Sequence, residues 1–386
     1  MPLLTRKRVI CAKIETTYGT DAVPTGAANA ILISAPQVMP MEMTLVQRNN
    51  IKSYLGNNPQ ALAAIHAKVT FNVEIAGSGT AGTSPAFGPL LRGCGLAETI
   101  FATPVTGTGT AGTVTSITLA AGASAVDGAY NGMTLNITGG TGAGESAVVK
   151  SYVGATKVAT FTSTLAVAPD VTSVYTIPAQ VIYTPISTAF ESLSIYFNVD
   201  GTLHALLGAR GTVQIDLPLL GIPMFKFAFT GLYVPVIDSA APVPILTAFQ
   251  SPLTVGNKNT SGLVVAGYPS AVGANMMLDV GNTVIFRSLV GGLENVMITD
   301  RKSVGTASIE ATSVTAKDWF GFVKSTTMGN FSLTHGVTAG NKVKFDAPST
   351  LLTKPTYQDA NGITMLQLAM DLVPSVGNDE LIISVQ

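Results

Sequence analysis

Residues 208–218 read Gly-Ala-Arg-Gly-Thr-Val-Gln-Ile-Asp-Leu-Pro, and residues 224–233 read Met-Phe-Lys-Phe-Ala-Phe-Thr-Gly-Leu-Tyr. Apolar and polar side chains alternate in both stretches, which is typical of β-strands with one buried face. A similar unit occurs later, where Val-Lys-Phe-Asp-Ala-Pro ends at Pro348 and a second alternating stretch fills residues 362–372. Repeats set the architecture of a chain. We therefore predict a duplicated β unit, in which residues 208–218 match residues 338–348.

The 386-residue chain is poor in charge. Charged residues make up 11% of it and hydrophobic residues 47%, whereas roughly 25% charged residues are usual in a soluble domain. A free monomer would expose a weakly charged surface, which favours association of copies; a large, well-packed β protein is the alternative. The 21 basic and 22 acidic residues do not indicate a high-affinity nucleic-acid binder, which concentrates Lys and Arg on one face.

The sequence also bears on location and redox state. No stretch reaches the roughly 18 to 20 apolar residues of a membrane-spanning helix, and Met1–Lys13 lacks the apolar core of a signal peptide. We therefore expect a soluble protein in the cytoplasm at synthesis. Cys11 and Cys94 have neither CxxC spacing nor a neighbouring histidine. We expect buried thiols, with a disulfide as the alternative.

Changes in composition divide the chain. Between residues 106 and 177, short β-branched runs alternate with Gly-rich turns, which predicts an inserted all-β module; low-complexity disorder is the competing interpretation. Residues 1–105 and 178–238 around it form a first unit, the proline-containing stretch 239–252 a linker, and residues 253–386 a second unit. Short helices are expected at Pro85–Gly95 and Ala316–Lys324. The fold class is therefore mainly β, with two tandem units and one insertion.

Motifs for catalysis are weak. Residues 77–82 and 107–112 both fit GxGxxG, but β-branched residues follow the second, and Pro85 and Pro89 interrupt the helix that should follow the first. The histidines His66, His204 and His335 are far apart in the sequence. We expect no enzyme activity, no metal site and no cofactor, and interpret residues 77–82 as a strand-to-helix loop.

Several longer motifs point to one family. The sequence resembles the tail tube proteins (major tail proteins) of long-tailed, siphophage-like phages, in their long form. The resemblance covers most of the chain outside residues 106–177 and is carried by Glu15–Pro24, Tyr54–Gly56, Glu74–Gly82, Pro85–Gly95, Phe190–Ser192, Gly208–Thr212, Phe229–Tyr233, Thr299–Arg301, Leu333–Asn341, Pro355–Tyr357 and Asn378–Leu381.

The resemblance implies two tandem β-sandwich or barrel domains of the tail-tube type, each with a short flanking helix. Copies would form rings whose sheets join into a barrel around a lumen wide enough for DNA, and the rings would stack into the tail of the virion. Two such domains per chain favour a trimeric, pseudo-sixfold ring over a hexamer. The implied partners are further copies, tail terminator, tape measure and tail-tip proteins, with DNA passing through transiently and no membrane contact.

Site residues follow from strand alternation and this resemblance. In Lys68–Ile75, the polar face includes Asn72 and Glu74. These two residues, with Glu310 in the second unit, are the candidates that face the lumen. The candidates for ring stacking are Arg48, Asn49, Asn50, Lys52 and Tyr54 in one polar loop, and Tyr18 and Asp21 in the N-terminal arm.

Two other functional classes stay open. One is a different β-rich virion protein, such as a tail terminator or a decoration subunit; self-polymerisation distinguishes it, because a terminator stops at one ring. The other is a carbohydrate-binding or hydrolytic protein that uses the inserted module. Sugar sites usually combine exposed aromatic residues with paired carboxylates, and residues 106–177 contain few of either.

Overall fold

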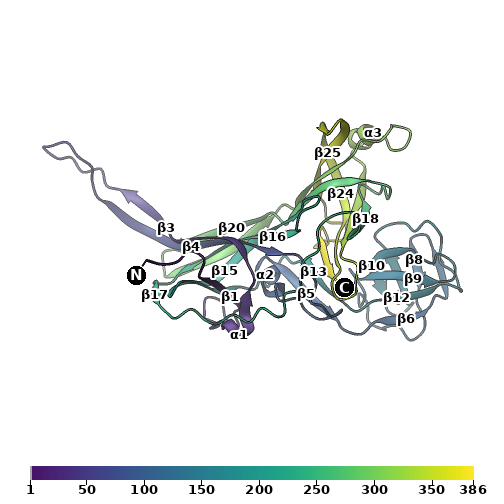
Figure 1. Cartoon of the computed structure of the whole chain (residues 1–386), viewed down its shortest axis with the longest axis horizontal. Helices are drawn as coiled ribbons and strands as arrows, with labels where there is room; N and C mark the ends of the chain where they lie inside the picture. Colours follow the sequence, from purple (N-terminus) through teal and green to yellow (C-terminus); the bar gives the residue numbers. More distant parts are fainter. Residues whose placement is uncertain (1) are drawn as a thin grey trace.

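The computed structural model describes residues 2–386, and strands dominate it, so the mainly-β prediction is confirmed (Figure 1). Eight strands pair in one antiparallel series, which we call the long sheet. In spatial order they are β3 (Ser34–Gln47), β4 (Gln60–Glu74), β16 (Met224–Tyr233), β15 (Thr202–Leu217), β19 (Gly273–Asp279), β22 (Val304–Glu310), β25 (Ile363–Leu372) and β24 (Val343–Ala360).

The long sheet consists of two matching series of four strands. In each series a pair of strands (β3–β4 or β19–β22) pairs with the second strand of a later hairpin (β16 of β15–β16, or β25 of β24–β25). Glu74 lies opposite Met224, and Glu310 lies opposite Met365, so the two glutamates end equivalent strands. A repeated four-strand unit is therefore present in the structure.

The register predicted for the repeat is wrong, however. Residues 343–347 pair with the neighbouring strands β23 and β26, and the part of β24 that pairs with β25 is Thr350–Ala360. The true equivalent of Gln214–Leu217 is thus Thr356–Asp359. Strand β24 also continues through Pro348 and Pro355, where a strand end was expected. Alternation repeats every two residues, so many registers fit the same pattern.

Further strands form side sheets that cover the core. In the first half these are β2 (Ala30–Ile31), β1 (Arg8–Ile14), β14 (Leu193–Val199) and β17 (Ile237–Asp238), which join through β15. In the second half they are β18 (Thr260–Val264), β23 (Met328–His335), β26 (Ile382–Val385), β13 (Gln180–Pro185) and β5 (Leu96–Phe101), which join through β24.

Strand pairing crosses the expected division into units. Strands β5 and β13 come from the first part of the chain but join the second half, because β13 pairs with β26. One hydrophobic core extends through both halves, from Phe227 to Phe345 and Leu368. Residues 239–252 form no helix or strand, but they adhere to the first half: the Ile245 amide donates to the Gly26 carbonyl at 3.0 Å.

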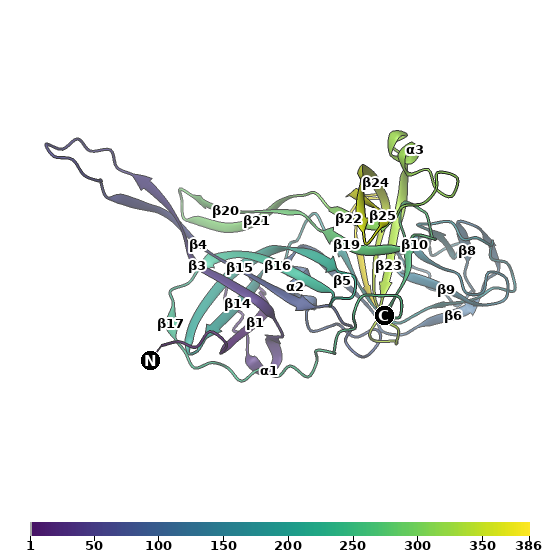
Figure 2. The same cartoon turned by 45° about the horizontal axis from the view of Figure 1, so that its top comes forward.

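Residues 105–177 form a separate seven-stranded sheet with its own core around Ile117, Val149 and Tyr175. Its strands, in spatial order, are β6 (Val105–Thr108), β12 (Val174–Ile177), β9 (Thr134–Gly139), β10 (Ser146–Val153), β11 (Val158–Phe161), β8 (Ser116–Thr118) and β7 (Ala111–Thr113). Val105 pairs directly with Ile177, so the module leaves and re-enters the body at one place. It projects from the right of the body (Figure 2).

Within residues 2–386, three short helices complete the fold: α1 (Gly26–Asn29), α2 (Gly88–Gly93) and α3 (Trp319–Lys324). Both predicted helices are present but shorter than expected. Helix α2 begins only after Pro85 and has Pro89 in its first turn, where proline is tolerated. At α3 the Asp318 carboxylate caps the first turn by accepting a hydrogen bond from the Gly321 amide at 2.7 Å.

Two long hairpins extend from equivalent places. Strands β3 and β4 continue beyond the body as a free arm, seen at the left of Figure 1. Strands β20 (Asn282–Leu289) and β21 (Leu293–Arg301) connect β19 to β22 in the same way, but this hairpin lies against β15 and β16. The hairpin packs Val296 and Ile298 into buried positions.

Candidate functional site

The joint between the two halves is a short ladder inside the chain. Strand β15 pairs with β19 through Gln214–Asp279, Ile215–Leu278, Asp216–Met277 and Leu217–Met276. Ile215 and Leu278 are both fully buried. An edge strand of the first series thus meets an edge strand of the second series, and the pairing covers the backbone groups of both.

The two ends of the long sheet have no such cover within the described residues. Strand β3 pairs only with β4, and residues 356–360 of β24 pair only with β25. At these edges Met39, Met41 and Met43 are 39 to 50% exposed, and Tyr357 is 59% exposed. Tyr357 is the equivalent of the buried Ile215. The chain therefore carries two edge strands with exposed apolar side chains among their residues, each able to pair with another strand.

The two edge strands correspond to the two strands of the internal joint: β3 corresponds to β19, and β24 corresponds to β15. Gln37, Val38 and Met39 are the positions in β3 that match Met277, Leu278 and Asp279 in β19, because Gln37 pairs with Thr70 as Met277 pairs with Thr306. The positions equivalent to the internal ladder are therefore Gln37 and Gln358, Val38 and Tyr357, and Met39 and Thr356. The two edges of one chain lie seven strand spacings apart, about 34 Å, so they cannot pair with each other.

The predicted lumen residues lie on one face of the long sheet. Asn72 and Glu74 alternate with the buried Phe71 and Val73 on β4, and Glu310 follows the buried Ile309 on β22. Their face carries further carboxylates at Asp216, Asp279 and Asp371. This arrangement brings together acidic groups from both halves along one face.

Both lysines near the centre of this face are paired. The Lys226 Nζ lies 2.6 Å from the Asp216 carboxylate, and the Lys68 Nζ lies 3.7 Å from the Glu42 carboxylate. DNA phosphates bind proteins mainly through available Lys and Arg. A face with paired lysines and several carboxylates would attract phosphates weakly.

The stacking candidates fall into two groups. Arg48, Asn49, Asn50, Lys52 and Tyr54 are exposed at the tip of the arm, where the Lys52 ammonium lies 5.5 Å from the centre of the Tyr54 ring. Ile51 and Leu55 in the same tip are fully exposed. Apolar side chains exposed in this way mark a contact surface.

Tyr18 is instead half-buried inside the chain. Its hydroxyl accepts a hydrogen bond from the Val296 amide at 2.5 Å, and the Arg210 guanidinium lies 4.9 Å from its ring centre. Burial raises the pKa of Tyr18. Tyr18 therefore holds the β20–β21 hairpin. Asp21 is exposed but accepts a hydrogen bond from the Tyr196 hydroxyl.

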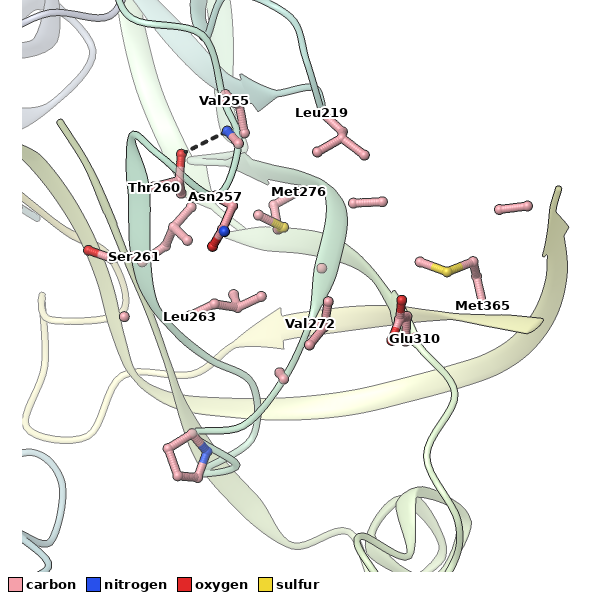
Figure 3. A pocket seen from close by; sticks show the side chains of 18 of the residues that line it. Leu219, Val255, Asn257, Thr260, Ser261, Leu263, Val272, Met276, Glu310 and Met365 are labelled. Carbon is pink, nitrogen blue, oxygen red and sulfur yellow. Dashed lines mark hydrogen bonds between the residues drawn. The ribbon is translucent and has the colours of Figure 1, made fainter. Parts of the chain in front are cut away.

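A cavity of about 570 Å³ opens beside Glu310 (Figure 3). Apolar side chains such as Leu263, Val272, Met276 and Met365 line most of it, and Glu310 supplies the one charged group. At the equivalent Glu74, Phe249 and Gln250 of the linker line a cavity of only about 10 Å³. The linker therefore occupies the groove beside Glu74 in the first half, whereas the equivalent groove beside Glu310 in the second half is open.

The side chains that could bind a metal ion are not clustered in the described part of the chain. Residues 2–386 contain no group of three His, Cys, Asp or Glu side chains able to hold a metal ion. Cys11 and Cys94 are buried and unpaired, as the sequence predicts, and burial raises the pKa of Cys11 to about 11. Both thiols are therefore protonated at neutral pH.

Comparison with known proteins leaves the family open: no family model matches the chain, and no curated protein matches it. Among residues 2–386, no helix is both long enough and apolar enough to span a membrane.

Proposed function

We propose that the protein is a structural subunit of a phage tail tube and that its copies polymerise into stacked rings. One observation carries this proposal: the internal β15–β19 joint leaves two exposed edges, β3 and β24, whose residues match the two sides of that joint. Pairing β24 of one copy with β3 of the next repeats the joint. Closed repetition of such a head-to-tail contact produces a ring.

Three chains would supply six series of four strands, because each chain contains two. The acidic, lysine-paired face with Asn72, Glu74 and Glu310 would line the lumen. DNA could then pass without being held, since the phosphate contacts that dominate non-specific affinity would be few. The protein would act in the tail of the virion, with terminator, tape measure and tail-tip proteins as partners.

Electron microscopy of the purified protein at high concentration tests the proposal. We expect stacked hollow rings, with three subunits per ring in end-on views. Six subunits per ring would keep the tube but refute the pseudo-sixfold arrangement. Single rings that never stack would indicate a terminator, and persistent monomers in the presence of tail-tip components would favour a decoration subunit or a carbohydrate-binding module.

A further inference from the structure

The free arm and the β20–β21 hairpin are equivalent parts of the duplication. The hairpin leaves the long sheet after Asp279 and returns at Val304; the arm leaves after Met39 and returns at Lys68. These four residues occupy matching positions, since Asp279 pairs with Val304 and Met39 with Lys68. The connections are similar in length, with residues 280–303 (24 residues) against residues 40–67 (28 residues).

The hairpin shows how such a connection binds the neighbouring series. The Asn282 Nδ2 donates to the Gly211 carbonyl on β15 at 2.9 Å, and the Arg210 guanidinium donates to the Val296 carbonyl at 2.8 Å. Phe286 stacks on His66 of β4, with 4.9 Å between ring centres. The hairpin of the second series therefore lies across β15, β16 and β4 of the first.

The outer part of the arm, residues 42–65, has the side chains for a similar contact, and among the described residues its two strands pair only with each other. Met43, Leu45, Val46 and Leu62 are 45 to 57% exposed, and Leu45 and Leu62 pair across the two strands of the arm. By contrast, Val296 of the hairpin is fully buried.

The equivalent receiving face in the second half is open. Lys302 is the counterpart of His66, and it is exposed, whereas His66 is covered by Phe286. A cavity of about 480 Å³ lies beside it, lined by Lys302, Asp371 and Val373. Leu351 and Leu352, the counterparts of Arg210 and Gly211, lie on the same part of β24.

We propose that the arm of each copy docks across β24 and β25 of the adjacent copy in the same ring. The arm would cover the region of Lys302, Leu351 and Asp371 as the β20–β21 hairpin covers the first half of its own chain. The arm would then bind sideways within a ring, and the tip residues Arg48–Tyr54 would extend past that neighbour. This assignment rests on the proposed tube function, since a second copy is the partner.

Photo-crosslinking tests where the arm binds. A benzophenone amino acid replaces Leu45 or, in a second variant, Leu62, and the crosslinked peptides of assembled tubes are identified by mass spectrometry. We expect crosslinks to residues 300–303, 351–357 and 369–373. The same probe at Val126, which is 67% exposed on the module, is the matched control and should not label these peptides.

The outcomes separate the two proposals. Tubes whose arm crosslinks only to other surfaces would overturn the docking site and leave the tube function standing. A protein that never self-associates would overturn both.

A second measurement uses Leu45→Ser with Leu62→Ser, which changes exposed side chains and so leaves the monomer folded. Burying two leucines on docking predicts that this variant needs an about tenfold or more higher protein concentration to form tubes. Val126→Ser should leave that concentration unchanged. An unchanged concentration for the double variant would also overturn the docking.

Discussion

His335 shows how a single buried side chain makes the fold sensitive to pH. Its Nε2 lies 3.1 Å from the Leu253 carbonyl and its Nδ1 lies 3.0 Å from the Thr260 hydroxyl. The neutral ring satisfies both contacts, with Nε2 donating and Nδ1 accepting. Burial lowers the pKa of His335 below the usual 6.5. The residue that the sequence presents as an isolated histidine thus fixes Leu253 and Thr260, at the start of the second half, to the end of strand β23.

The stability of the protein should fall in mild acid. The pKa of His335 is lower in the folded than in the unfolded state, so the unfolded chain takes up the proton first as the pH falls. Stability is complete above about pH 6.5 and decreases below it; burial lowers the pKa values of His66 and His204 as well. The melting temperature should drop between pH 7.5 and 5.5, and less so in His335→Gln. An equal drop in both proteins would contradict this.

Single residues were partly predictable from the sequence. Alternation along β4 and β22 identified Glu74 and Glu310 as equivalent, because strand geometry alone fixes which side chains share a face. Tyr18 was predicted as a stacking residue, yet its hydroxyl binds Val296, 278 positions along the chain. The alternation of side chains along a short segment gives no information about a contact between residues so far apart in the sequence.

At the scale of the strand, the edges β3 and β24 make the most specific prediction. Gln37 and Gln358 are both exposed and would lie opposite each other in the proposed ladder. Like charges directly opposite are destabilising by up to about 1 kcal/mol, and opposite charges are stabilising. Gln37→Lys with Gln358→Lys should therefore raise the concentration needed for tube formation about fivefold.

The matched control reverses one charge. The variant that combines Gln37→Glu with Gln358→Lys places opposite charges across the ladder. It should assemble at the same protein concentration as the unmodified protein, or at a lower one. Light scattering against protein concentration measures both variants. If the two double variants assemble alike, Gln37 and Gln358 do not face each other.

The elements themselves were more predictable than their partners. Alternation found β15, β16 and β25, and turn residues and aromatic clusters found α2 and α3. The predicted register of β24 was wrong by 12 residues, since Gln214 corresponds to Thr356 and not to Lys344. A pattern of period two fits many alignments, and two prolines concealed the continuity of the strand. Prolines are tolerated there because this stretch lies at a bulge and at an edge.

At the scale of the whole molecule, the sign of the charge on the polar face of the long sheet would determine how strongly the tube binds DNA. Asn72→Lys, Glu74→Lys and Glu310→Lys together add five positive charges per chain, one from Asn72 and two from each glutamate. Tubes of this variant should retain double-stranded DNA in low salt and release it as salt rises, and assembled particles should eject DNA more slowly. Lysines at five exposed module positions add the same five charges and control for net charge: Val126, Ser151, Val153, Val167 and Val171. An ejection rate equal to that of the unmodified protein would contradict a lumen role.

The pairing of strands between distant parts of the chain was the least predictable feature of the fold. The sequence indicated the inserted module and the duplication, but it assigned Leu96–Phe101 and Gln180–Pro185 to the first half. In the structure Gln180–Pro185 pairs with β26 of the second half, and Leu96–Phe101 pairs with Gln180–Pro185. Such pairing joins residues some 200 positions apart, so it depends on which edges remain open after local strands have formed.

The internal β15–β19 joint also changes the entropy of assembly. In a ring of separate single-domain subunits, every joint costs an estimated 4–15 kcal/mol in lost translational and rotational freedom. Residues 239–252 tether the two series covalently, so in the proposed ring only alternate joints would carry that cost. The remaining joints could then be individually weaker, and the two halves would be free to diverge: one keeps its hairpin folded on its own chain, and the other leaves its arm free.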